Sequence, residues 1–200
     1  MGIFSASRTI CGLGGIMRIA ALCGSLRTGS YNQALLEAAI ERGAAQGLEI
    51  VQAQIREFPL FNQDLEADPI PAVAEAKRII QSADAILLVS PEANYSVPGV
   101  LKNAVDWLSR PFRDPTLIGR PMAVIGASTG YMGTIRAQLA WRQMWHFFNA
   151  PVFSGAEFVL PMAASLIDED GRLSDTATLE RLDAYLAALA EWVARYGSPS

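Results

Sequence analysis

Residues 85–99 read AILLVSPEANYSVPG, and this stretch decides the fold class. The run 85–89 is apolar without alternation, which is typical of a strand buried on both faces of a parallel sheet. A polar loop follows, and Pro98 fits the first turn of a helix. That helix carries its apolar residues on one stripe, at Val100, Leu101, Ala104, Val105 and Leu108. A buried strand followed by an amphipathic helix is the repeating unit of a parallel α/β sheet.

The same unit recurs on both sides of this stretch. Apolar runs at 17–23, 48–53, 122–127 and 152–160 are read as strands, with Gly155 suggesting a bulge in the last one. The segments 32–42, 71–82, 134–148 and 175–196 are read as helices. Five strand–helix units predict a three-layer α/β fold, with helices on both faces of a five-stranded parallel sheet in the order 2-1-3-4-5. Residues 1–16 show neither the alternation of a strand nor the period of a helix. We therefore expect a disordered N-terminal extension before a single domain at 17–200.

Composition excludes several classes of protein. The chain has 200 residues, of which 51% are hydrophobic and 18% charged, so general disorder is ruled out. No apolar run reaches the roughly 18 residues of a membrane span. The net charge is −4, whereas a nucleic-acid binder typically carries an excess of basic residues. Two cysteines and one histidine cannot build a cysteine-rich or multi-histidine metal site, and this cysteine usage fits the cytoplasm.

A ligand is expected beyond the carboxyl ends of the strands, where strand order reverses between the first and third strands. The first loop there, residues 24–32, offers hydroxyl, guanidinium and amide donors at Ser25, Arg27, Ser30 and Asn32. Helix capping alone would explain Ser30 but would leave Ser25 and Arg27 unexplained. We therefore favour an anion site, although the spacing matches neither the phosphate loop of NTPases nor the dinucleotide fingerprint.

Two further loops converge on the same edge. Residues 91–99 are stiffened by prolines and alternate polar groups with an aromatic one, so they either wrap a planar ring, with Asn94 orienting it, or form a rigid turn. Glu92 is read as an acceptor of backbone hydrogen bonds more readily than as a general acid. Residues 126–133 carry three glycines, which allow close backbone approach to a ligand or a tight turn.

Other reactive side chains are read as structural. Cys23 ends the first strand and is expected to be a small buried hydrophobe rather than a nucleophile. His146 lies in the aromatic segment 141–148, and we expect a helix-face or interface residue rather than a base.

Three segments together resemble the NADPH-dependent FMN reductase family. They are LCGSLRTGSYN (22–32), SPEANYSVPGVLKNAVDWLSRP (90–111) and GASTGYMGTIRAQLAWRQ (126–143). The family has a flavodoxin-like fold and includes quinone, chromate and azo-dye reductases, and the resemblance runs from about residue 17 to the last helix. It implies a cytoplasmic flavoenzyme that binds FMN non-covalently and forms a homodimer or homotetramer.

The reaction implied by the resemblance needs no catalytic side chain and no metal. NADPH or NADH passes hydride to N5 of the flavin, and a quinone-like or other small acceptor then takes two electrons at the same face. Neither nucleic acid nor membrane is implied as a partner.

The resemblance also implies three sets of FMN contacts. The phosphate loop corresponds to Ser25, Arg27, Ser30 and Asn32. The lining of the ribityl chain and isoalloxazine corresponds to Pro91, Glu92, Ala93, Asn94, Tyr95 and Ser96. The loop that closes over the flavin corresponds to Ser128, Gly130 and Gly133. Ala93 departs from the family, which commonly has tyrosine there, and a backbone contact would survive this change whereas an aromatic wall would not.

Two alternatives remain open. A flavodoxin-type electron carrier would share fold and cofactor without turning over NADPH, although the modest charge and Arg27 argue against it. A non-catalytic FMN-binding module is the other alternative.

Overall fold

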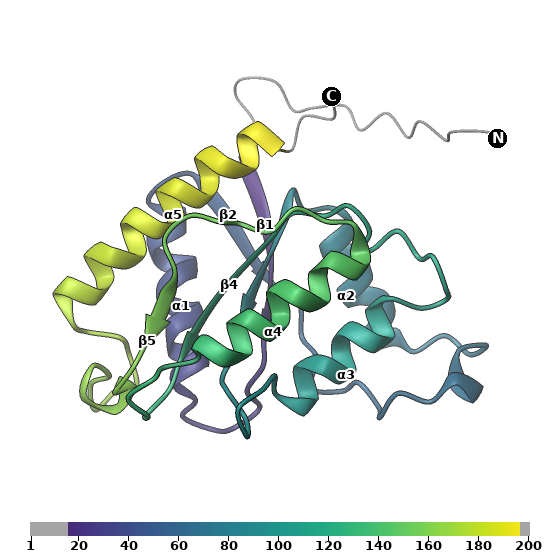
Figure 1. The fold of residues 1–200 in the computed structure, drawn as a ribbon, viewed down its shortest axis with the longest axis horizontal. Helices are drawn as coiled ribbons and strands as arrows, with labels where there is room; N and C mark the ends of the chain where they lie inside the picture. The colour runs from purple at the N-terminus through teal and green to yellow at the C-terminus, as the bar shows by residue number, and fades with distance from the viewer. Residues whose placement is uncertain (1–15, 197–200) are drawn as a thin grey trace.

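The computed structural model describes residues 16–196, so most of the expected N-terminal extension lies outside the described residues. Five strands form one parallel sheet in the order β2-β1-β3-β4-β5 (Figure 1). They are β1 (Met17–Cys23), β2 (Leu48–Gln52), β3 (Ala85–Val89), β4 (Met122–Ala127) and β5 (Phe158–Leu160). The predicted fold class and strand order are confirmed.

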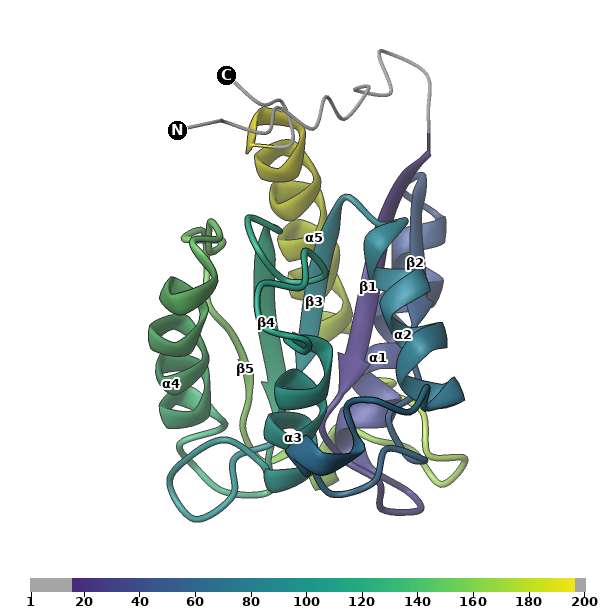
Figure 2. The same ribbon diagram turned by 90° about the vertical axis from the view of Figure 1, so that its right-hand side faces the viewer.

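Helices cover both faces of the sheet (Figure 2). One face packs against α1 (Tyr31–Ala44) and α5 (Thr176–Tyr196). The other packs against α2 (Pro71–Gln81), α3 (Gly99–Leu108) and α4 (Ile135–Trp145). Short 3₁₀ turns lie at Gln63–Leu65, His146–Phe148 and Ala163–Ser165. None of the helices in residues 16–196 is both long and apolar enough to cross a membrane.

The centre of the sheet is buried on both faces, as the unbroken apolar run predicted. All five residues of β3 are completely buried. Alternate residues of the strand contribute to opposite cores: Leu87 packs with the α1–α5 layer, and Ile86 with the α2–α3–α4 layer. This alternation follows from the two-residue period of a strand.

The fifth strand is shorter than the sequence predicted. Val152 makes one isolated bridge to Met122, and regular pairing resumes only at Phe158. Between them the ring of Phe153 covers Gly155, where a Cβ would lie 2.3 Å from the ring atom Cζ. Only glycine permits this close approach of the ring, and the chain between Val152 and Phe158 forms a loop. The prediction of a continuous strand with a bulge at Gly155 is therefore wrong.

The parallel sheet brings three connections to one edge. Because all five strands run in the same direction, the loops after β1, β3 and β4 leave from the same side. The first leads to α1 on one face and the second to α3 on the other, which creates the reversal point between β1 and β3.

Candidate functional site

The first loop packs directly against the prolines of the second. The amide of Gly24 donates to the carbonyl of Val89 at 2.8 Å. A Cβ at Gly24 would lie 2.9 Å from Cγ of Pro98 and 3.0 Å from Cδ of Pro91. Glycine is therefore required here by close packing, and it fixes the distance between the two loops.

The N-terminus of α1 presents donors and a positive partial charge to solvent. Ser30 caps the helix by accepting the amide of Gln33 at 3.2 Å, and its hydroxyl proton remains available to a ligand. The first turn contains no acidic residue. Arg27 is exposed, with its guanidinium 4.9 Å from the centre of the Tyr31 ring. A helix N-terminus with an exposed cation and hydroxyls beside it is suited to a phosphate group.

A second arginine braces this loop from a distant part of the chain. Arg56, in the segment after β2, donates from Nη2 to the carbonyl of Leu26 at 2.8 Å. The sequence analysis did not identify Arg56, because nothing in its local sequence indicates a contact with the first loop.

The amide side chain of Asn32 is engaged within the protein. Its Nδ2 donates to the carbonyl of Ala127 at 2.8 Å, and its Oδ1 accepts the amide of the same residue at 2.9 Å. The side chain is buried. Asn32 was expected to contact phosphate, but the structure places it as a clamp between the start of α1 and the end of β4.

The second loop contains a tight hairpin. Ala93 and Ser96 exchange two backbone hydrogen bonds, of 3.0 and 2.9 Å. Asn94 and Tyr95 form the tip, with φ values of 49° and 68°. Positive φ at both central residues is the geometry of a type I′ turn, which favours asparagine first and glycine second. Tyr95 therefore occupies the position that glycine normally takes, and its side chain is 74% exposed.

Glu92 connects the second loop to the start of α4. Its Oε2 accepts the backbone amides of Arg136 at 3.0 Å and Ala137 at 3.3 Å, and its Oε1 accepts Nη1 of Arg136 at 3.0 Å. The carboxylate therefore caps the N-terminus of α4. The interpretation of Glu92 as an acceptor of backbone hydrogen bonds agrees with this geometry, whereas the N-terminus of α1 is not covered by any carboxylate of its own first turn.

The third loop is held in a close turn. Ser128 Oγ accepts the amide of Gly130 at 3.0 Å, and Gly133 has a φ of 59°. At Gly126 a Cβ would lie 2.1 Å from the carbonyl oxygen of Ser90 and 2.5 Å from Oγ1 of Thr134. The end of β4 thus touches both the second loop and the start of α4, which no larger residue would allow.

The remaining candidates have structural surroundings. Cys23 is buried, and desolvation raises the pKa of its thiol. His146 is exposed at the end of α4, while Trp141, Trp145 and Phe148 belong to the core. Within residues 16–196 no three His, Cys, Asp or Glu side chains gather in a way that could hold a metal ion.

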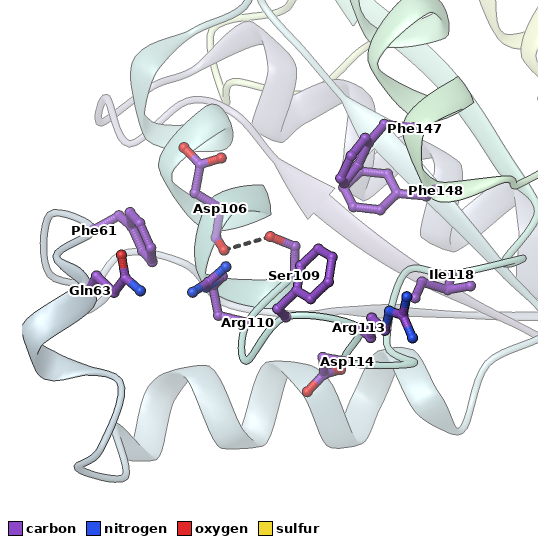
Figure 3. Close-up of a pocket in the computed structure, with 11 residues that line it drawn as sticks. Phe61, Gln63, Asp106, Ser109, Arg110, Arg113, Asp114, Ile118, Phe147 and Phe148 are labelled. Carbon is purple, nitrogen blue, oxygen red and sulfur yellow. Dashed lines mark hydrogen bonds between the residues drawn. The ribbon is translucent and has the colours of Figure 1, made fainter.

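A separate cavity of about 500 Å³ lies where α3 and α4 end (Figure 3). Four of its lining residues are phenylalanines, namely Phe61, Phe112, Phe147 and Phe148. Both helices run antiparallel to the strands, so their C-terminal ends lie at the edge opposite to the three loops. The helix ends that line this cavity therefore lie away from the three loops.

A doubly wound parallel sheet of this order, with polar loops at its reversal point, defines the flavodoxin-like class. Residues 17–165 match the NADPH-dependent FMN reductase family, and the chain belongs to that family. The predicted family, its oxidoreductase class and its dependence on FMN and NAD(P)H are confirmed at this level.

Relatives cover nearly the whole chain. An NAD(P)H-dependent FMN reductase of Pseudomonas aeruginosa is 42% identical over 90% of this chain and 96% of its own. An NAD(P)H:quinone oxidoreductase of Solanum tuberosum is 42% identical over 87% and 91%, respectively. The solved structure of the flavoenzyme FerB, an NAD(P)H:(acceptor) oxidoreductase from Paracoccus denitrificans, has a TM-score of 0.83 at 31% identity, covering 90% of this chain and 99% of that one.

Proposed function

We propose that this oxidoreductase holds FMN in the crevice between the three loops and passes electrons from NAD(P)H to a small, quinone-like acceptor. The observation that carries the proposal is the start of α1 at the reversal point of the sheet, with no acidic residue in its first turn and with two serines and an exposed arginine beside it. Relatives named quinone reductase, including one from Escherichia coli at 36% identity, support the choice of acceptor.

The phosphate end of FMN fits the first loop. Ser25, Arg27 and Ser30 supply side-chain donors. The amides of Tyr31 and Asn32 precede the hydrogen-bonded turns of α1, while that of Gln33 is bonded to Ser30 Oγ. Asn32 contributes by holding the start of α1 against Ala127. A charge-assisted bond from Arg27 adds to binding and gives preference for a phosphorylated flavin.

The ring end fits between the second and third loops. Bound FMN supplies the two-electron chemistry, and the chain supplies orientation and surroundings. The hairpin of 93–96 and the turn of 128–133, each closed by its own hydrogen bonds, would form the two walls beside a planar ring. The amide of Ala93 is used in the hairpin, so its backbone can offer a ligand only the second lone pair of its carbonyl oxygen, and its side chain is only a methyl group. Glu92 is already bonded to α4, so we assign it no role in proton transfer.

We further infer a homodimer or homotetramer in the cytoplasm. Exposed apolar side chains on the outer surface of α3 and α4 support association: Val100 is 37% exposed, Leu139 56% and Phe147, just beyond α4, 75%. The low cysteine content and the absence of a membrane-spanning helix in residues 16–196 are compatible with the cytoplasm.

Reduction of the bound flavin tests the proposal. Purified protein should be yellow, release FMN on denaturation, lose its colour with anaerobic NADPH and oxidise NADPH steadily when a quinone is added. A protein that holds flavin but is not bleached by NADPH would favour a non-catalytic FMN-binding module. A flavodoxin-type carrier would hold flavin without catalysing NADPH oxidation, and a colourless protein that stays colourless with added FMN would contradict flavin binding itself.

A further inference from the structure

We propose that Arg136 is a positioning residue that holds the tip of the second loop through the ring of Tyr95, so that the second and third loops keep one geometry for the flavin. The inference rests on the proposed function for its consequence in FMN binding, and its structural part can be measured in the protein without flavin.

The tip needs support because its backbone conformation is unfavourable. Asn94 tolerates the left-handed region, but a tyrosine with a φ of 68° is strained. The ring of Tyr95 is 74% exposed, so burial cannot hold this conformation. Only two backbone hydrogen bonds, between Ala93 and Ser96, close the hairpin itself.

Arg136 supplies the missing support from α4. The centre of its guanidinium group lies 3.9 Å from the centre of the Tyr95 ring, a close cation–π contact. The guanidinium cannot easily swing away, because Nη1 is bonded to Glu92 and the backbone amide of Arg136 is bonded to the same carboxylate. Arg136 therefore contacts both Glu92 and Tyr95 and ties the second loop at two points to the start of α4.

The position of these contacts connects them to the cofactor. Glu92 precedes the hairpin, Tyr95 forms its tip, and Arg136 lies three residues after the third loop ends at Gly133. If the contact is lost, the hairpin can relax towards negative φ at Tyr95, and it then no longer forms one fixed wall beside a planar ring. Binding weakens because the ordering of the loop must then accompany binding.

The first experiment measures hydrogen exchange in the flavin-free protein. Arg136→Gln removes the charge but keeps a side chain that can still bond to Glu92. We expect exchange of the Ser96 amide, which closes the hairpin, to become about twofold to fivefold faster, in line with the strength of an exposed cation–π contact. The matched control is Arg113→Ala, because Arg113 also lies over an aromatic ring, at 5.6 Å from that of Phe112, but at the cavity away from the loops. Unchanged exchange at Ser96 in Arg136→Gln would overturn the proposal.

The second experiment is a double-mutant cycle on FMN affinity, measured by quenching of flavin fluorescence. Arg136→Gln and Tyr95→Leu should each weaken FMN binding about twofold to fivefold. The double variant should bind FMN no more weakly than the weaker of the two single variants. Tyr95→Phe should restore most of the affinity lost in Tyr95→Leu, because a phenyl face also attracts the cation. The cation–π contact would be refuted as the cause of the weaker FMN binding by either of two results. One is a double variant in which the losses of affinity of the two single variants multiply, and the other is an equal loss of affinity in Tyr95→Phe and Tyr95→Leu. If the wild type binds no FMN, the proposed function fails, and hydrogen exchange still decides the role of Arg136.

Discussion

Replacing Asn32 by alanine separates two roles that its position at the start of α1 allows. If its amide serves the protein, as its contacts with Ala127 indicate, the variant should lose stability even without flavin. If its amide serves phosphate, the loss should appear only in FMN binding.

The contacts set the expected magnitude. Two hydrogen bonds disappear, and both the amide and the carbonyl of Ala127 are left without this partner in a buried place. A lost bond of this kind costs about 1–3 kcal/mol when the remaining group stays buried, so Asn32→Ala should destabilise the protein by about 2–4 kcal/mol. For a domain of this size that corresponds to a fall in the melting temperature of about 5–15 °C.

The assay is urea unfolding of the flavin-free protein, followed by tryptophan fluorescence. Gln63→Ala is the matched control, since Gln63 is exposed and its loss should change stability by less than about 0.5 kcal/mol. FMN and riboflavin should lose affinity alike in Asn32→Ala, because riboflavin lacks only the phosphate. An unchanged free energy of unfolding, together with a loss of affinity for FMN but not for riboflavin, would refute the clamp. Asn32 would then be assigned as a phosphate ligand.

Three further changes have defined outcomes. Arg27→Ala should weaken FMN binding about tenfold to hundredfold while riboflavin binding stays the same; equal effects on both flavins would remove Arg27 from the phosphate site. The hydrogen bond from Arg42 lowers the pKa of Asp183 in the folded protein. The ionised carboxylate therefore stabilises the fold fully above the pKa of about 4 that an aspartate has in the unfolded chain, and this stabilisation is lost as the pH falls through the lower pKa of the folded state. Unfolding of Asp183→Asn should therefore depend less on pH in the acid range, and an unchanged pH profile would contradict this. Burial raises the pKa of the Cys23 thiol, so it should react slowly with iodoacetamide in the native protein. With Cys11→Ser removing the other thiol, the reaction at pH 8 should be far slower in the native protein than in urea. Equal rates would show that the Cys23 thiol is accessible.

The fold was predictable because its signals are local. The apolar run of β3 and the stripe of α3 each fall within a few residues, and parallel connections of this kind admit few strand orders. The fifth strand was predicted too long because its interruption depends on how Phe153 packs over Gly155, which hydrophobic pattern does not reveal.

The contacts that fix the loop residues were not predictable from the sequence. The residues of the first loop could be chosen by chemistry, but the partners that fix them lie far away in the sequence. Asn32 bonds to a residue 95 positions away, Glu92 to one 44 positions away, and Arg56 to one 30 positions away. A single sequence carries no periodic signal for such pairs, so Asn32 was assigned to phosphate, and neither Arg56 nor Arg136 was identified.

The site is most directly tested by a crystal structure of the protein with FMN. We expect the phosphate at the N-terminus of α1, within hydrogen-bonding distance of the loop from Ser25 to Ser30, and the ring between the hairpin at Asn94 and the turn at Gly130. Density for FMN in the phenylalanine-lined cavity beside Phe112, with the start of α1 empty, would contradict the site proposed for this enzyme.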